Sequence, residues 1–119
     1  MSKARQNYMH QCDVLFSKLI RARGECELAS PSCRGPLQCA HGFSRRYSAV
    51  RCDPRNAFAL CQGHHFFYTH RPLEWVEWLR ERWGDELYAE LRTAALSQVK
   101  VDWKALSAEL RQRVSEAVG

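Results

Sequence analysis

Apolar residues spaced three and four apart predict a helix near the start of the chain. In the stretch "MHQCDVLFSKLIRAR" these residues are Cys12, Leu15, Phe16, Leu19 and Ile20. Residues at this spacing share one face of a helix, which would cover the core. We predict an N-terminal helix over residues 8–23 that ends at Gly24.

The pattern beyond Pro72 predicts helices to the end of the chain. "PLEWVEWLRERWG" has Pro72 in a place suited to a first turn and Gly84 as a stop, and "DELYAELRTAALSQ" begins with acidic residues, as helix N-termini favour. A last helix starting at Asp102 would present one apolar face, formed by Trp103, Leu106, Leu110, Val114 and Ala117. Residues 72–119 are therefore predicted to be a helical C-terminal extension.

The middle segment, residues 24–71, has no helical periodicity and only two short apolar runs. These runs, "LQCA" and "AFAL", predict two small strands. A core with so little regular structure usually needs an additional stabilising cross-link, such as a bound metal ion. We predict an α+β protein of one domain, residues 1–119, in which a small core lies between the N-terminal helix and the helical extension.

Six cysteines give this segment its candidate chemistry. The chain has no apolar run long enough to cross a bilayer, and its N-terminus lacks the apolar segment of a signal peptide, so we expect a cytoplasmic protein without membrane contact. A reducing compartment argues against disulfides. Metal binding or ordinary burial of the thiols is then expected.

Charge is distributed unevenly along the chain. Residues 1–71 carry 11 Lys and Arg against 4 Asp and Glu, a balance of +7, whereas residues 72–119 carry 7 against 9, a balance of −2. A basic front half suggests a polyanionic partner, most commonly nucleic acid. Ordinary solubilising charge explains the composition equally well.

The spacing of cysteine and histidine predicts a structural zinc site. Cys61 and His64 are two residues apart, which lets both reach one tetrahedral ion, and Cys26 and Cys33 enclose a short turn. His65 is a rival fourth ligand, because a three-residue gap is also sterically acceptable. In the alternative without metal, the cysteines are small buried thiols and His64 is a surface residue.

These residues carry a family resemblance. "LQCAHGFSRR" followed by "VRCDPRNAFALCQGHH", with a cysteine pair upstream, resembles the His-Asn-His (HNH) endonucleases of the ββα-metal fold. In detail it is similar to phage recombination nucleases of the lambda NinG type. The resemblance covers Cys26 to His70 and implies an HNH core with a zinc knuckle in residues 24–71.

The resemblance implies three catalytic residues. His41 would be the general base, Asn56 would hold the loop between the strands, and His65 would bind a catalytic Mg²⁺ or Mn²⁺ ion. His64 stands where the knuckle usually has a second cysteine. Ala40 stands where many members have an Asp or His that contacts the metal, so either another group supplies this contact or the site binds the ion weakly.

His70 and a group of arginines complete the candidate site. His70 could supply the missing metal contact, but it lies about 140° around a helix from His65, so helix capping is the competing interpretation. The loop and strand that an HNH motif lays against the minor groove contain four candidate phosphate contacts: Arg45, Arg46, Arg51 and Arg55.

Three functions follow from these observations. The first, implied by the resemblance, is a metal-dependent DNA endonuclease of the phage recombination or packaging type, which would have recombination or packaging proteins as partners and, if phage-encoded, would act in the bacterial host cytoplasm. The second is a non-catalytic, zinc-stabilised DNA-binding module, suggested by Ala40. The third is a protein-interaction domain whose helical tail docks through its tryptophans: Trp75, Trp78, Trp83 and Trp103.

Overall fold

The computed structural model describes residues 2–118 and has four helices around a two-stranded sheet. The elements in chain order are α1 (Lys3–Arg21), β1 (Leu37–His41), β2 (Ala57–Cys61), α2 (Gln62–Thr69), α3 (Pro72–Ala95) and α4 (Trp103–Val118). Two short 3-10 helices, η1 (Ser48–Val50) and η2 (Pro54–Asn56), lie between the strands. The predicted α+β class is confirmed. Among residues 2–118, no helix combines the length and apolar character that a membrane span requires.

The first helix is longer at its start than its apolar pattern predicts. It begins at Lys3 rather than at residue 8 and ends at Arg21 rather than at residue 23. Ser2 caps it, with Oγ accepting a hydrogen bond from the Arg5 backbone N–H at 3.1 Å. Its first turns are exposed, so apolar spacing carries no information about them. Gly24 follows with a φ of 87°, a left-handed conformation that ends the helical path.

The C-terminal helices follow the predicted pattern with one change of connection. The two helices predicted on either side of Gly84 form α3, which kinks there because Gly84 has φ 78° and ψ 166°, and α3 ends at Ala95. Asp102 precedes α4, and its Oδ1 accepts a hydrogen bond from the Ala105 backbone N–H at 3.0 Å. Each predicted strand is one residue longer than its apolar run.

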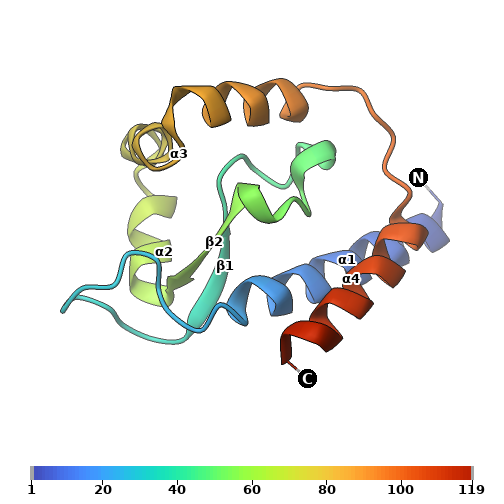
Figure 1. Ribbon diagram of the computed structural model, residues 1–119, viewed down its shortest axis with the longest axis horizontal. Coiled ribbons are helices and arrows are strands. Elements are labelled where there is room, and N and C mark those ends of the chain that lie inside the picture. Colours follow the sequence, from blue (N-terminus) through green and yellow to red (C-terminus); the bar gives the residue numbers. More distant parts are fainter. Residues whose placement is uncertain (1, 119) are drawn as a thin grey trace.

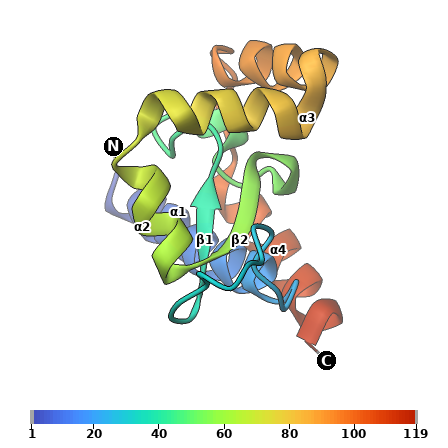
Figure 2. The same cartoon turned by 90° about the vertical axis from the view of Figure 1, so that its left-hand side faces the viewer.

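The sheet lies between α3 on one side and the pair of helices α1 and α4 on the other, as Figures 1 and 2 show, and an apolar cluster packs on each of its faces. The strands are antiparallel, with Leu37 opposite Cys61 and His41 opposite Ala57. On one face Ala57 and Ala59 pack with side chains of α1 and α4: Cys12, Phe16, Ile20, Trp103 and Leu110. The other face packs against α3 through Ala40, Phe58, Leu60 and Leu79. The short sheet is therefore stabilised by helices on both faces.

The tryptophans of the helical extension belong to this packing. The ring centroids of Trp75, Trp78 and Trp83 lie 5.7, 4.8 and 5.8 Å from that of Phe58. Trp103 is 3% exposed in the cluster on the opposite face. Their rings stabilise the fold from within, because aromatic side chains bury large apolar areas.

Replacing Phe58 tests whether the aromatic cluster stabilises the fold. Phe58→Ala should lower the free energy of unfolding by about 3–5 kcal/mol, because it leaves a cavity between the sheet and α3. Phe66→Ala is the matched control, since Phe66 is 68% exposed and its loss should cost much less. Urea denaturation measures both. Equal costs for the two variants would contradict this account of the core.

Candidate functional site

Four side chains from two distant segments converge on one point. The Sγ atoms of Cys26, Cys33 and Cys61 lie 3.5, 3.6 and 3.2 Å from His64 Nδ1. All four ligand atoms lie within 4.8 Å of one another. Tetrahedral zinc with ordinary Zn–S and Zn–N bonds places its ligands about 3.5–3.8 Å apart. The cluster could therefore hold one metal ion such as zinc, as the spacing predicts.

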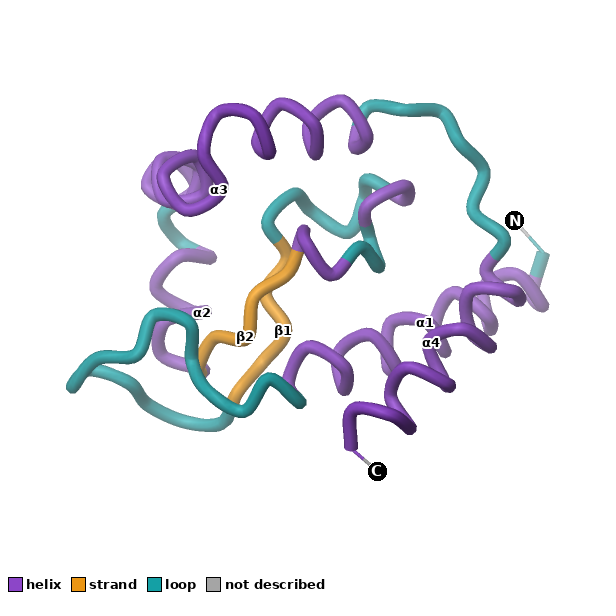
Figure 3. The backbone as a smooth tube through the Cα atoms, in the orientation of Figure 1, coloured by secondary structure: helices purple, strands orange, loops and turns teal. Residues whose placement is uncertain are grey.

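The backbone around the cluster favours this arrangement. Residues 22–36 form a loop without helix or strand that projects beside the sheet (Figure 3). Its Glu27 is tied to β2 by hydrogen bonds between Glu27 N and Ala59 O at 2.8 Å and between Ala59 N and Glu27 Oε2 at 2.7 Å. These contacts bring Cys26 to the end of β2, where Cys61 is the last strand residue and the N-cap of α2.

The electrostatic surroundings favour a thiolate at Cys61. Burial alone would raise the pKa of Cys61, but hydrogen bonds from the backbone N–H groups of His64 and Arg34, both at 3.4 Å from Sγ, outweigh it and lower the pKa to about 6. The thiolate is the form that binds metal.

The structure distinguishes between the two adjacent histidines. His64 lies in the cysteine cluster, whereas His65 Nδ1 is 2.8 Å from Gln38 Oε1 on β1, outside the cluster. One turn of α2 thus directs neighbouring histidines to different places. His64, rather than its rival His65, is the fourth ligand-bearing residue.

Asn56 fixes the loop between the strands. Its side chain is fully buried at the end of η2. Asn56 Nδ2 donates to Phe43 O at 3.0 Å and to Val50 O at 3.1 Å, and Oδ1 accepts from Phe43 N at 2.7 Å. Gly42 fits here because a Cβ would lie 2.5 Å from the Trp83 ring and 2.8 Å from Asn56 Oδ1. The segment after β1 therefore has one defined path.

His41, the last residue of β1, is oriented by this loop. Its Nε2 lies 2.8 Å from the backbone carbonyl oxygen of Arg51. A carbonyl only accepts, so Nε2 carries the proton and Nδ1 of the neutral ring has a free lone pair. Burial lowers the pKa of His41 below its usual value of 6.5, against the opposing effect of the bond to Arg51. The neutral ring is the form favoured near pH 7.

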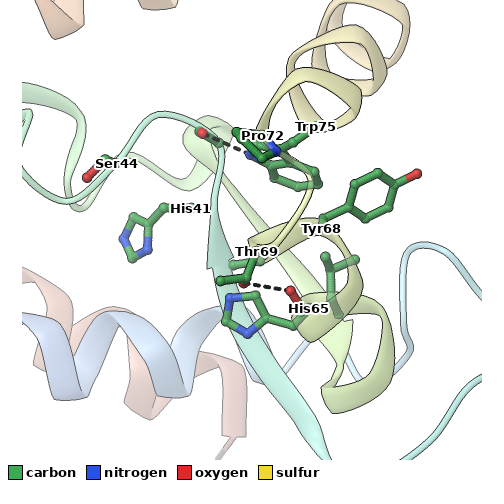
Figure 4. A pocket seen from close by; sticks show the side chains of 10 residues that line it. His41, Ser44, His65, Tyr68, Thr69, Pro72 and Trp75 are labelled. Carbon is green, nitrogen blue, oxygen red and sulfur yellow. Dashed lines mark hydrogen bonds between the residues drawn. The ribbon is translucent and has the colours of Figure 1, made fainter.

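His41 and His65 line the same open cavities. One, of about 220 Å³, extends to Ala40, Tyr68 and Trp75, and the other, of about 680 Å³, extends to Asp13, Ser17, Cys39 and Arg45. Four residues line both: His41, Ser44, His65 and Thr69. Figure 4 shows the two imidazole rings beside β1. The Thr69 hydroxyl donates a hydrogen bond to the backbone carbonyl of His65. The two predicted catalytic histidines thus lie at one open site.

His70 lies outside the cavities that His41 and His65 line. It is the C-cap residue of α2, and its ring packs 4.4 Å from that of Phe66 rather than lining either cavity. Within residues 2–118, no carboxylate joins His41 or His65 in a group of three ligands suited to a metal. A catalytic ion here would have His65 as its protein ligand, with the remaining positions left to phosphate and water.

The four predicted phosphate contacts have different surroundings. The Arg45 side chain is 59% exposed beside the cavity, and the guanidinium of Arg46 lies over the Tyr47 ring. Arg51 instead forms a bidentate ion pair with Asp13 of α1, at 2.8 and 2.6 Å. Arg55 is paired with Asp53 and Glu90, both at 2.9 Å. Sequence reasoning did not identify Asp13, because nothing local marks a carboxylate that pairs 38 residues away.

Comparisons of the chain with protein-family models, curated proteins and solved structures find no significant match.

Loss of one ligand should remove the metal and unfold the core. We expect purified protein to contain one zinc ion per chain by elemental analysis, and His64→Ala to lose both the zinc and cooperative unfolding, because structural zinc contributes on the order of 10 kcal/mol to folding. His64→Cys should retain zinc, since thiolate is an equivalent ligand. His70→Ala is the control that leaves the cluster intact. Folded wild-type protein without bound metal would contradict the assignment.

Proposed function

We propose that the protein is a metal-dependent endonuclease that hydrolyses phosphodiester bonds in DNA, with an HNH-type ββα-metal core formed by β1, β2 and α2. The observation that carries the proposal is the pairing of His41 Nε2 with the Arg51 carbonyl in a cavity that His65 also lines. This pairing supports a basic Nδ1 beside a candidate metal ligand. The substrate class, and the setting of phage recombination or packaging, come from the resemblance of residues 26–70.

The chain's own residues supply the proton chemistry. His41 Nδ1 would accept a proton from the attacking water while Nε2 keeps its hydrogen bond to Arg51. Asn56 would maintain that geometry by holding Phe43 and Val50. A Mg²⁺ or Mn²⁺ ion bound at His65 would neutralise charge on the phosphate and on the leaving 3′ oxygen.

Binding of DNA would use exposed basic residues in the segment after β1. Arg45 lines the larger cavity and Arg46 follows it on the surface, so both guanidinium groups could contact DNA phosphates. Arg51 and Arg55 would have to leave close ion pairs at 2.6 and 2.9 Å, whereas the contact between Arg45 and Asp13 is looser, at 3.7 Å. We therefore assign the principal phosphate contacts to Arg45 and Arg46.

A DNA-binding module without catalysis is the second candidate. Ala40 favours it, because within residues 2–118 no carboxylate is grouped with His65 as a metal ligand, and Asp13, which lines the cavity, is engaged by Arg51. The docking function proposed for the tail gains no support from the tryptophans, which pack around Phe58 or on α1. Cleavage of DNA therefore distinguishes the endonuclease from the non-catalytic DNA-binding module.

Two histidine substitutions separate binding from chemistry. His41→Ala should leave zinc content and DNA affinity near wild type, while cleavage falls by about 10²–10⁴-fold, the usual contribution of a positioned base. His65→Ala should also lose cleavage, but a higher Mg²⁺ or Mn²⁺ concentration should restore part of it, because that variant lacks a metal ligand. Cleavage of plasmid DNA measures both. Wild-type activity in His41→Ala would exclude His41 as the base.

The pH dependence of cleavage gives an independent readout of His41. Protonation of Nδ1 removes the base, so the rate should fall as the pH decreases through the pKa of His41. Burial lowers this pKa, so the midpoint of the acidic limb should lie below 6.5. Single-turnover rates measured from about pH 5 to about pH 8, the range in which histidine ordinarily titrates, locate this midpoint. A midpoint above 7 would contradict the assignment.

A further inference from the structure

We infer that Asp13, on the N-terminal helix and outside the ββα core, is a positioning residue for His41 that acts through Arg51. This inference rests on the proposed function, because it concerns the base of that reaction. It assigns α1 a part in the active site as well as in the core. The pathway has two contacts, one between Asp13 and the Arg51 side chain and one between the Arg51 carbonyl and His41.

The first contact is a strong, directional ion pair. Asp13 Oδ1 accepts from Arg51 Nε at 2.8 Å, and Oδ2 accepts from Nη2 at 2.6 Å. The two side chains are only 18% and 16% exposed. Bidentate pairing fixes the orientation of both groups, and partial burial reduces the screening of their attraction. The guanidinium also donates through Nη1 to the Arg45 carbonyl at 3.2 Å.

The second contact connects the backbone of the same residue to the base. Arg51 O accepts from His41 Nε2 at 2.8 Å, so the position of this carbonyl determines which way Nδ1 faces. Asn56 holds the preceding carbonyl, that of Val50, at 3.1 Å. Asn56 therefore restrains this segment through the Val50 carbonyl, and Asp13 restrains the next residue through the Arg51 side chain. Phe16, one turn after Asp13 on α1, packs 5.6 Å from the His41 ring.

The geometry favours positioning over metal binding by Asp13. Both carboxylate oxygens face Arg51, and Oδ2 also lies 3.7 Å from Arg45 Nη1. A carboxylate surrounded by two guanidinium groups is already neutralised. Asp13 thus lines the cavity without offering a free oxygen to a cation.

Activity measurements can test the pathway with a double-mutant cycle. Asp13→Asn and Arg51→Met should each lower kcat by about 10–10²-fold, because the base is misaligned in both variants. The double variant should be no worse than the poorer single variant, since all three lose the same pair. Glu90→Gln, which removes the ion pair between Arg55 and Glu90, is the matched control and should retain wild-type kcat.

The imidazole itself provides a readout that does not depend on cleavage. Nitrogen-15 NMR of the DNA-free protein at pH 7.5, with His41→Ala identifying the signals, should show His41 protonated at Nε2 in the wild type. Asp13→Asn should shift the ring toward a mixture of tautomers, while Glu90→Gln should not. If the wild type fails to cleave DNA, the proposed function fails and the tautomer shift alone decides the inference. Unchanged kcat, additive losses in the cycle or an unchanged tautomer in Asp13→Asn would each overturn it.

Discussion

The buried amide of Asn56 is the constraint on which the candidate site depends. Its three hydrogen bonds to Phe43 and Val50 set the path of the segment that leaves β1 and returns to β2. A buried amide without these partners would cost stability, so the loop has one favourable arrangement. That arrangement places the Arg51 carbonyl against His41, and the orientation of the His41 ring follows from it.

The cluster of cysteines and His64 has a complementary role. Two strands of five residues cannot form a stable core alone, and the loop that carries Cys26 and Cys33 has no regular structure of its own. A metal ion at the cluster would join this loop to the start of α2. Because His65 follows His64 directly, the same turn that places His64 in the cysteine cluster also directs His65 to the cavity.

Sequence reasoning recovered the features that depend on neighbouring residues. The two-residue gap between Cys61 and His64 limits their possible geometry, and the strand-forming runs lie beside clear turn signals. The Asp13–Arg51 pair could not be predicted in this way, because it forms only when α1 docks on the sheet. The predicted start of α1, at residue 8, was wrong for a different reason. The exposed first turns of this helix depend on helix propensity and on the Ser2 cap rather than on apolar spacing.

Digestion of DNA by the wild-type protein tests the central claim most directly. Zinc-loaded protein would be incubated with supercoiled, linear and branched DNA in the presence of Mg²⁺, Mn²⁺ or a chelator that leaves the structural zinc in place. The account predicts cleavage of at least one of these substrates that requires added Mg²⁺ or Mn²⁺. Binding of all three without cleavage under any metal condition would contradict it and favour the non-catalytic DNA-binding module.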